Sequence, residues 1–250
     1  MSKPVLSAHF ESRVPSDVRL SQMKYAEREV KPEAVINVAI GNVSLPTNPA
    51  MQKRLFNLDA PESPFNKGVI RYTATGGFDE TQAAFKNILK CEGFDTSKLS
   101  VIVTDGGSTG MELLLIGVCG PAGTGEKPLM MIDPAYTNYI SFAKRVGRKT
   151  VTVKRYLNED GKFSLPEIDK IEETIKANNP GALLVIPYDN PTGQLYDKET
   201  LVQLAKLCVK YNMWMVSDEA YRELFYVEGS ELVSIWGLTD KDVPGIEGRR

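Results

Sequence analysis

Apolar residues in this chain gather in short unbroken runs rather than at alternating positions. The four clearest runs are "SVIVT" at 100–104, "LMMI" at 129–132, "ALLVI" at 182–186 and "WMV" at 214–216. A strand with one face in water alternates apolar and polar residues, whereas a strand covered on both faces is apolar throughout. The pattern therefore predicts strands buried on both faces at 99–104, 129–132, 182–187 and 214–217, with a further β-rich run at 150–155.

Helical patterns lie between these runs, and they are predicted over 77–92, 108–118, 137–146, 166–177 and 198–211. Strands that alternate with helices of this length are joined by crossover connections, which make the paired strands parallel. The sequence thus predicts an α/β fold, in which a mostly parallel sheet carries helices on both faces.

The N-terminal part of the chain lacks this regular alternation. One helix is predicted near 16–30, and "VINVAIG" at 35–41 is typical of a short strand that runs into a loop. The segment "APESPFNKG" at 60–68 is rich in turn residues and marks a boundary. We therefore expect two parts, an N-terminal segment over 1–65 and the α/β domain over 66–250.

Composition excludes several classes of protein. The 250 residues are 42% hydrophobic and 25% charged with a net charge of -2, which argues against nucleic-acid binding. No run of about 18 apolar residues predicts a membrane span, and the first residues do not resemble a signal peptide. Cys91, Cys119 and Cys208 are far apart, as in reduced cytosolic proteins, and the single His9 has no partner at metal-ligand spacing. We expect a cytoplasmic protein without a metal site.

Four strand ends carry unusual chemistry, and ligands of parallel sheets bind beyond the carboxyl ends of strands. The first is the glycine-rich turn "TDGGSTG" at 104–110, which leads into a helix. Glycines let a ligand approach the backbone closely, and free N–H groups at a helix N-terminus suit a phosphate. The alternative is a tight turn capped by Asp105, Ser108 or Thr109.

The next two strand ends offer an aromatic ring and an amide. Tyr136 follows the strand at 129–132 and can stack on a flat ligand, or it can simply pack over the sheet edge. Asn190 in "YDNPTG" can donate a hydrogen bond to a ligand oxygen, or it can form an Asx turn.

The fourth strand end is "SDEAYRE" at 217–223. Asp218 places a carboxylate at the end of an apolar strand, where a pyridine nitrogen facing it would stay protonated, and Tyr221 adds a phenol three residues later. The alternative for Asp218 is an ordinary helix N-cap.

In this order the four strand ends resemble the class I/II aminotransferases, which are pyridoxal-phosphate enzymes of fold type I. The resemblance covers nearly the whole chain, and "NPTG" followed by "SDEAY" is its most specific part. It implies the large domain of that fold at 66–250, incomplete at its C-terminal end, and part of the smaller domain with the substrate loop at 1–65.

The resemblance also implies roles for single residues. The cofactor phosphate would be held by Gly107 and Ser108, the ring would stack on Tyr136, and its nitrogen would pair with Asp218. Asn190 and Tyr221 would hydrogen-bond the ring O3′ oxygen.

Two weaker matches lie upstream. "IRYTATGG" at 70–77 resembles the segment whose tyrosine, here Tyr72, crosses a dimer interface to the partner's cofactor phosphate. "AIGNVSLP" at 39–46 resembles the loop whose glycine, here Gly41, approaches the substrate carboxylate. Together they imply a homodimer that acts on an amino acid and a 2-oxo acid.

One part of the family pattern is absent. The lysine that forms a Schiff base with the cofactor follows later in the family, and this sequence stops at "GIEGRR". We therefore expect the chain to be the N-terminal portion of a longer enzyme and inactive alone. The reaction stays open between transamination and another pyridoxal-phosphate reaction, such as that of a β-lyase or an aminocyclopropane-carboxylate synthase. A non-catalytic cofactor-binding module is a third interpretation.

Overall fold

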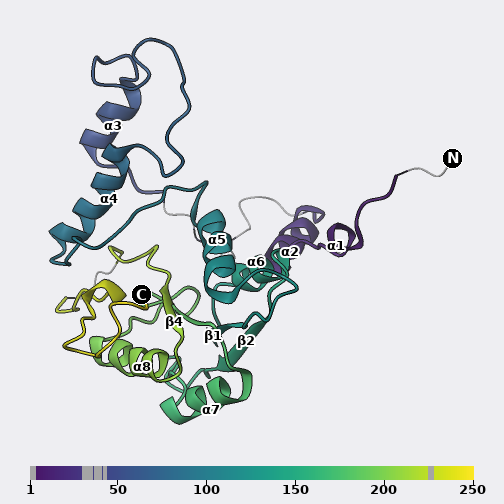
Figure 1. The fold of residues 1–250 in the computed structure, drawn as a ribbon. Helices are drawn as coiled ribbons and strands as arrows, with labels where there is room; N and C mark the ends of the chain where they lie inside the picture. Colours follow the sequence, from purple (N-terminus) through teal and green to yellow (C-terminus); the bar gives the residue numbers. More distant parts are fainter. Residues whose placement is uncertain (1–3, 30–35, 37–40, 42–43, 225–227) are drawn as a thin grey trace. The chain divides into compact units, whose positions relative to one another are not determined.

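A computed structural model describes residues 4–29, 36, 41, 44–224 and 228–250 (Figure 1). The chain divides into two compact units, residues 1–73 and 74–250. This division falls eight residues after the boundary predicted from "APESPFNKG", and the roles predicted for the two parts remain predictions.

The first unit contains three helices among its described residues, α1 (Ala8–Glu11), α2 (Asp17–Ala26) and α3 (Pro49–Phe56). The helix predicted near 16–30 is confirmed over the range of α2. None of the three helices buries a residue. Most of the strand expected at 35–41 lies outside the described residues.

The second unit alternates helices and strands along the chain. In order they are α4 (Asp79–Cys91), α5 (Gly107–Cys119), β1 (Leu129–Asp133), α6 (Asn138–Arg145), β2 (Thr150–Lys154), α7 (Ile168–Asn178), β3 (Ala182–Val185), α8 (Lys198–Lys210), β4 (Trp214–Ser217) and the 3₁₀ helix η2 (Ile235–Gly237). The four strands form one parallel sheet in the order β2-β1-β3-β4. The predicted α/β fold with a parallel sheet is confirmed.

Both faces of the sheet are covered by helices. Successive residues of each strand point to opposite faces, so β1, β3 and β4 each contribute to two apolar clusters. In β1, Met130 and Ile132 pack in one apolar cluster with residues of α7 and α8. Leu129 and Met131 pack in a second cluster with residues of α5 and α6. Figure 1 shows these helices around the strands. The unbroken apolar runs in the sequence are thus explained by burial on both sides.

One predicted strand is wrong. The apolar segment 99–104 forms no strand among the described residues, and Ile102 is 71% exposed. The amide of Val103 donates to the carbonyl oxygen of Gly76, 3.2 Å away, and not to a strand. A strand exists only where a neighbouring strand pairs with it, and an apolar run does not by itself supply that neighbour.

Candidate functional site

The loops that follow β1, β3 and β4 leave the sheet at one edge. These strands are parallel and in register, with Met131 beside Leu184 and Leu184 beside Val216, so their carboxyl ends lie together. The loop after β1 carries Tyr136, the loop after β3 carries Asn190, and Asp218 directly follows β4. The structure therefore brings these three predicted site residues to the same edge.

Helix α5 points its N-terminus toward this edge. Its last turn lies at the opposite edge, since a Cβ added to Gly181, just before β3, would come within 2.6 Å of the Val118 carbonyl oxygen. The Lys127 amide, just before β1, donates to the Cys119 carbonyl at 3.2 Å. A helix of 13 residues rises about 20 Å, at roughly 1.5 Å per residue, so the two ends of α5 lie at different edges of the sheet.

The N-terminus of α5 has no side-chain cap. Its N-cap is Gly106, with φ 82°, and no side chain of the described residues accepts from the first amides of the helix. The capping by Asp105, Ser108 or Thr109 considered above is thus not formed; Thr109 donates its hydroxyl back to the Asp105 carbonyl at 3.4 Å. The first N–H groups of a helix have no partner within the helix, and here they remain free for a ligand.

Tyr136 stands half-exposed after β1 and packs on a second aromatic ring. Its ring meets that of Tyr139 edge to face, with centroids 5.5 Å apart and an interplanar angle of 82°. Its hydroxyl accepts a hydrogen bond from Asn138 Nδ2 at 2.6 Å. The ring is therefore held from one side, in an orientation that a mobile surface tyrosine would not keep.

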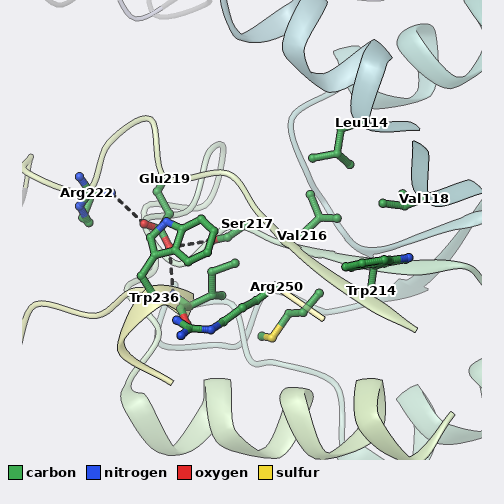
Figure 2. A pocket seen from close by; sticks show the side chains of 11 residues that line it. Leu114, Val118, Trp214, Val216, Ser217, Glu219, Arg222, Trp236 and Arg250 are labelled. Atoms are coloured by element: carbon green, nitrogen blue, oxygen red, sulfur yellow. Dashed lines mark hydrogen bonds and ion pairs between the residues drawn. The ribbon is translucent and has the colours of Figure 1, made fainter. Parts of the chain in front are cut away.

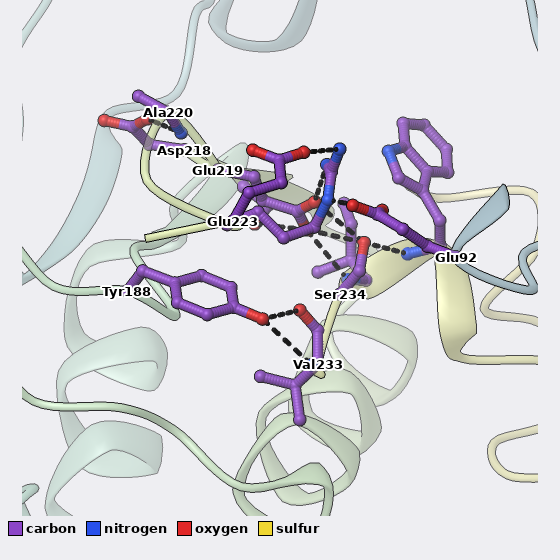
Figure 3. Close-up of polar contacts among 12 residues, drawn as sticks. Glu92, Tyr188, Asp218, Glu219, Ala220, Glu223, Val233 and Ser234 are labelled. Carbon is purple, nitrogen blue, oxygen red and sulfur yellow. Dashed lines mark hydrogen bonds and ion pairs between the residues drawn. The ribbon is translucent and has the colours of Figure 1, made fainter. Parts of the chain in front are cut away.

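Asp218 is held by two hydrogen bonds, one of which the sequence did not indicate. The hydroxyl of Tyr139, which is buried, donates to Oδ2. The amide of Ala220 donates to Oδ1 at 3.0 Å, as Figure 3 shows. Burial and the neighbouring Asp218 carboxylate raise the pKa of Tyr139, which stays a hydrogen-bond donor at neutral pH. Asp218 thus has a fixed orientation, and it caps a short turn rather than a helix.

Asn190 lies in a turn that the backbone closes without using its side chain. The Gly193 amide donates to the Asp189 carbonyl at 2.9 Å, and Gly193 takes a φ of 70°, which favours glycine. Among the described residues, no side chain or backbone group forms a hydrogen bond with the side-chain amide of Asn190. The Asx turn considered above is therefore not formed, and the amide of Asn190 is free to bind a ligand.

The remaining predicted residues are more exposed. Tyr221 is 37% exposed, in the turn after Asp218, and Gly107 and Ser108 are exposed at the start of α5. Gly41 and Tyr72 belong to the first unit and are exposed within it. Their predicted contacts with substrate and with a partner's cofactor stay predictions.

Sequence reasoning missed Tyr139. A usable signal was its position, since Tyr139 is an aromatic residue in the first turn of the helix that follows the loop with Tyr136.

A cavity of about 370 Å³ lies along β4 and reaches the end of that strand (Figure 2). It is lined by Leu114, Val118, Trp214, Met215, Val216, Ser217, Glu219, Arg222, Ile235, Trp236 and Arg250. A second cavity of about 490 Å³ lies between α4, the segment 99–102 and the turn after β4. Neither cavity is lined by Tyr136, Asn190 or Asp218, so we place the candidate site at the strand ends on chemical grounds.

Comparison with known proteins identifies the family of this chain. The model of the family "aminotransferase class I and II" matches residues 33–246. This chain belongs to that family. An aspartate aminotransferase of Sulfolobus acidocaldarius is 29% identical over 203 residues, which are 81% of this chain and 48% of that protein. The chain spans about half the length of the curated relatives it matches.

Solved structures of aminotransferases share the fold. An alanine aminotransferase from Pyrococcus furiosus superposes with a TM-score of 0.74 at 25% identity, over 94% of this chain and 57% of that one. A pyridoxal-phosphate-bound C–S lyase from Staphylococcus hominis superposes with a TM-score of 0.60 at 21% identity, over 72% of this chain and 43% of that one, which shows the fold alone. The fold type I assignment is confirmed.

Within the described residues of this aminotransferase-family chain, the helices are too short or too polar to cross a membrane.

Proposed function

We propose that this chain is part of a pyridoxal-phosphate-dependent aminotransferase, which moves an amino group between an amino acid and a 2-oxo acid. Membership of the aminotransferase family supports the reaction class. The observation that carries the proposal is the arrangement at one sheet edge, where the fixed carboxylate of Asp218 lies with the free amide of Asn190 and the uncapped start of α5. An anion site, an amide and a carboxylate are what a phosphorylated pyridine requires.

The start of α5 fits the phosphate group of the cofactor. In the part of the chain that the structure describes, its first amides have no side-chain acceptor, and a Cβ added at Gly107 would meet no atom within 4 Å. The backbone amides of Gly107 and Ser108 would donate to the phosphate oxygens, helped by the Ser108 hydroxyl and by the positive end of the helix dipole.

The strand ends fit the ring of the cofactor. Asp218 would pair with the ring nitrogen, Asn190 and Tyr221 would donate to the ring oxygen, and Tyr136 would pack on the ring face. When bound, the cofactor supplies an electron sink for the bonds at the amino-bearing carbon of the substrate. The ion pair with Asp218 is what would keep the ring nitrogen protonated and the sink effective.

Tyr139 would act on this site through Asp218. A carboxylate fixed by two donors keeps its lone pairs in one direction, so no reorganisation is needed when a ligand arrives. Gly41 would approach the substrate carboxylate.

We propose that the active protein is a cytoplasmic homodimer in which Tyr72 reaches the cofactor phosphate of the partner subunit. The exposure of Tyr72 within its own unit supports such a role. Mixed dimers of a Tyr72→Phe chain and an Asp218→Asn chain test it. One site in each mixed dimer carries both lesions and the other carries neither, so activity should return on mixing. No return of activity would refute the crossing.

The reaction is tested with the full-length protein that contains these residues. Pyridoxal phosphate is added first, and binding is followed by absorbance. A ¹⁵N-labelled amino acid and 2-oxoglutarate are then supplied, for each of the common amino acids in turn. We expect ¹⁵N in glutamate for at least one donor, measured by mass spectrometry.

Three outcomes of this experiment differ in meaning. Release of ammonia and a 2-oxo acid without ¹⁵N-glutamate would identify a lyase. Binding of the cofactor without any turnover would favour the non-catalytic module. Failure to bind pyridoxal phosphate would refute the cofactor assignment.

A further inference from the structure

Two buried arginines stand at opposite ends of strand β2. Arg148 precedes the strand and Arg155 follows it, and the side chain of each is only 1% exposed. Arg148 pairs with Glu126 at 2.8 Å. Arg155 pairs with Asp189, whose side chain is fully buried. The second pair therefore lies at the edge of the sheet that carries the candidate site.

Arg155 reaches across β1 to two separate loops, because β1 stands between β2 and β3 in the sheet. Its Nη2 donates to the Pro134 carbonyl oxygen at 2.7 Å, in the loop that leads to Tyr136. Its Nη1 donates to Gln194 Oε1 at 3.2 Å, in the turn after β3. The guanidinium thus joins the loop after β1 to the turn after β3.

Asp189 completes the connection inside the turn that carries Asn190. It directly precedes Asn190, and its Oδ2 accepts from the Thr192 hydroxyl at 2.9 Å. Its amide donates to the Gln194 carbonyl at 2.9 Å, and its carbonyl accepts from Gly193. Asp189, just before Asn190, is thus hydrogen-bonded to residues that follow Asn190 in the turn. These hydrogen bonds fix the backbone from which the side-chain amide of Asn190 projects.

Both charges of this ion pair are buried, so each requires the other for compensation. An arginine does not lose its proton in a protein, so Arg155 requires an anion when it is buried. Burial raises the pKa of Asp189, and Arg155 opposes that rise. Removal of one member of a buried pair leaves the other charge without compensation, which is strongly destabilising. Each charge is therefore needed by the other, and the loops to which they belong are held together.

We propose that Arg155 and Asp189 form a buried clamp that positions the Tyr136 loop against the Asn190 turn. Both are positioning residues, since neither reaches the surface of the site. This proposal rests on the proposed function only in treating Tyr136 and Asn190 as cofactor contacts. The holding of the two loops is a property of the protein without cofactor.

Hydrogen–deuterium exchange of the full-length, cofactor-free protein tests the clamp. Arg155→Met is compared with Arg148→Met, which removes an equally buried arginine from the other end of β2. We expect exchange in 133–139 and 188–196 to quicken by about tenfold or more in Arg155→Met. In Arg148→Met these two segments should keep the wild-type rate.

Two conservative variants, called the mild variants, keep the test valid where Arg155→Met does not fold. Asp189→Asn retains the shape and an oxygen that can accept from Arg155 but leaves the arginine charge uncompensated, and it should quicken exchange mainly in 188–196. Arg155→Lys retains a charge for Asp189 but cannot reach Pro134 and Gln194 together. In 188–196 its exchange rate should be higher than in wild type and lower than in Asp189→Asn. In 133–139 its exchange rate should exceed that of wild type. Wild-type exchange in both segments of both mild variants, or equal quickening in Arg148→Met, would overturn the clamp.

Affinity for pyridoxal phosphate separates this proposal from the proposed function. The dissociation constant should rise by roughly tenfold in Arg155→Met and less in Arg155→Lys, and stay within about twofold in Arg148→Met. A wild-type protein that binds no cofactor refutes the proposed function, while exchange still decides the clamp. Variants that bind as tightly as wild type refute an effect of the clamp on the cofactor contacts and leave the proposed function standing, and exchange again decides whether the loops are held.

Discussion

Asp218 and Glu219 are adjacent carboxylates just beyond β4, and their surroundings are opposite. Glu219 is bonded from all sides by protein donors, as Figure 3 shows. It accepts from the Ser217 hydroxyl at 3.0 Å, the Ser234 hydroxyl at 2.8 Å, the Ile235 amide at 3.0 Å and Arg222 Nη1 at 2.9 Å. Asp218 accepts from Tyr139 and Ala220 alone among the described residues.

The difference teaches how to assign a role to a carboxylate. Glu219 has as many donors as its two oxygens can accept, so no capacity remains for a ligand. Its partners come from the end of β4, from the turn after it and from the start of η2, and through Arg222 the network reaches Glu92, just after α4, at 2.8 Å. Its function is to hold these segments together. Asp218 is oriented by two donors and retains free lone pairs toward the sheet edge.

The largest effect is expected at Asp218. Asp218→Asn removes the charge and keeps the shape, so the ring nitrogen of the cofactor would lose its anionic partner. We expect turnover to fall by about 10²-fold to 10³-fold, the scale of a lost electrostatic contact in an active site. The free energy of unfolding, measured in urea without cofactor, should change by less than about 1 kcal/mol. A large loss of stability with normal turnover would assign Asp218 to turn formation only.

Glu219 should give the reverse result. Glu219→Gln leaves Arg222 with Glu92 and Glu223 but turns two acceptors into one acceptor and one donor that faces donors. We expect a loss of about 2–3 kcal/mol in the free energy of unfolding, because a buried network is left partly unsatisfied. The dissociation constant for pyridoxal phosphate should stay within about twofold. If instead binding is lost at unchanged stability, the contrast between the two carboxylates is wrong.

The sequence predicted the elements of this region well, for a physical reason. Runs such as 129–132 and 182–187 are apolar on both sides, and only a sheet covered by helices gives such strands. Because parallel strands end at one edge, the order of the strands and loops along the chain was enough to predict that Tyr136, Asn190 and Asp218 lie together. The segment 99–104 has the same apolar pattern but forms no strand, since pairing depends on a neighbour that the segment itself does not encode.

Contacts between distant residues were beyond the sequence. Arg155 and Asp189 are 34 positions apart in numbering, and they meet only because β2 and β3 flank β1. The contact between Tyr139 and Asp218 likewise requires α6 to lie over the end of β4. A single sequence shows that charged residues come directly after predicted strands. Which of these residues pair with one another depends on the order of the strands in the sheet, which the sequence alone did not give.

Tyr139 allows a finer test of how Asp218 is held. Tyr139→Phe removes one of the two donors to Asp218 and keeps the ring in place. A hydrogen bond to a charged group contributes about 1.5–3 kcal/mol, so we expect cofactor affinity to fall by about tenfold. Tyr136→Phe is the matched control, because its hydroxyl bonds only Asn138 among the described residues, and affinity should change by less than about threefold. Equal effects of the two variants would show that Tyr139 acts by packing alone.

The smallest effect is expected at a third carboxylate, Asp242, which like Glu219 has only structural partners but lies nearer the surface. Lys198 Nζ donates to it at 2.8 Å and the Thr239 amide at 2.9 Å, and these hydrogen bonds lower the pKa of Asp242 to about 2. The unfolded chain has an aspartate pKa near 3.9, so the contribution is complete above about pH 4 and is lost as the pH falls toward 2. Solvent screening limits it to about 1 kcal/mol or less.

Asp242→Asn should therefore lower the unfolding free energy slightly at pH 7 and flatten its fall between about pH 4 and pH 2, where wild type loses this contribution. Urea unfolding at a series of pH values measures both effects, and 1 M salt should reduce the difference at pH 7 because the pair is partly exposed. An unchanged slope in that acid window would mean that Lys198 and Thr239 do not favour the ionised form. Cofactor affinity at neutral pH should match wild type in Asp242→Asn, as in Glu219→Gln, because both carboxylates hold protein segments and neither faces the sheet edge.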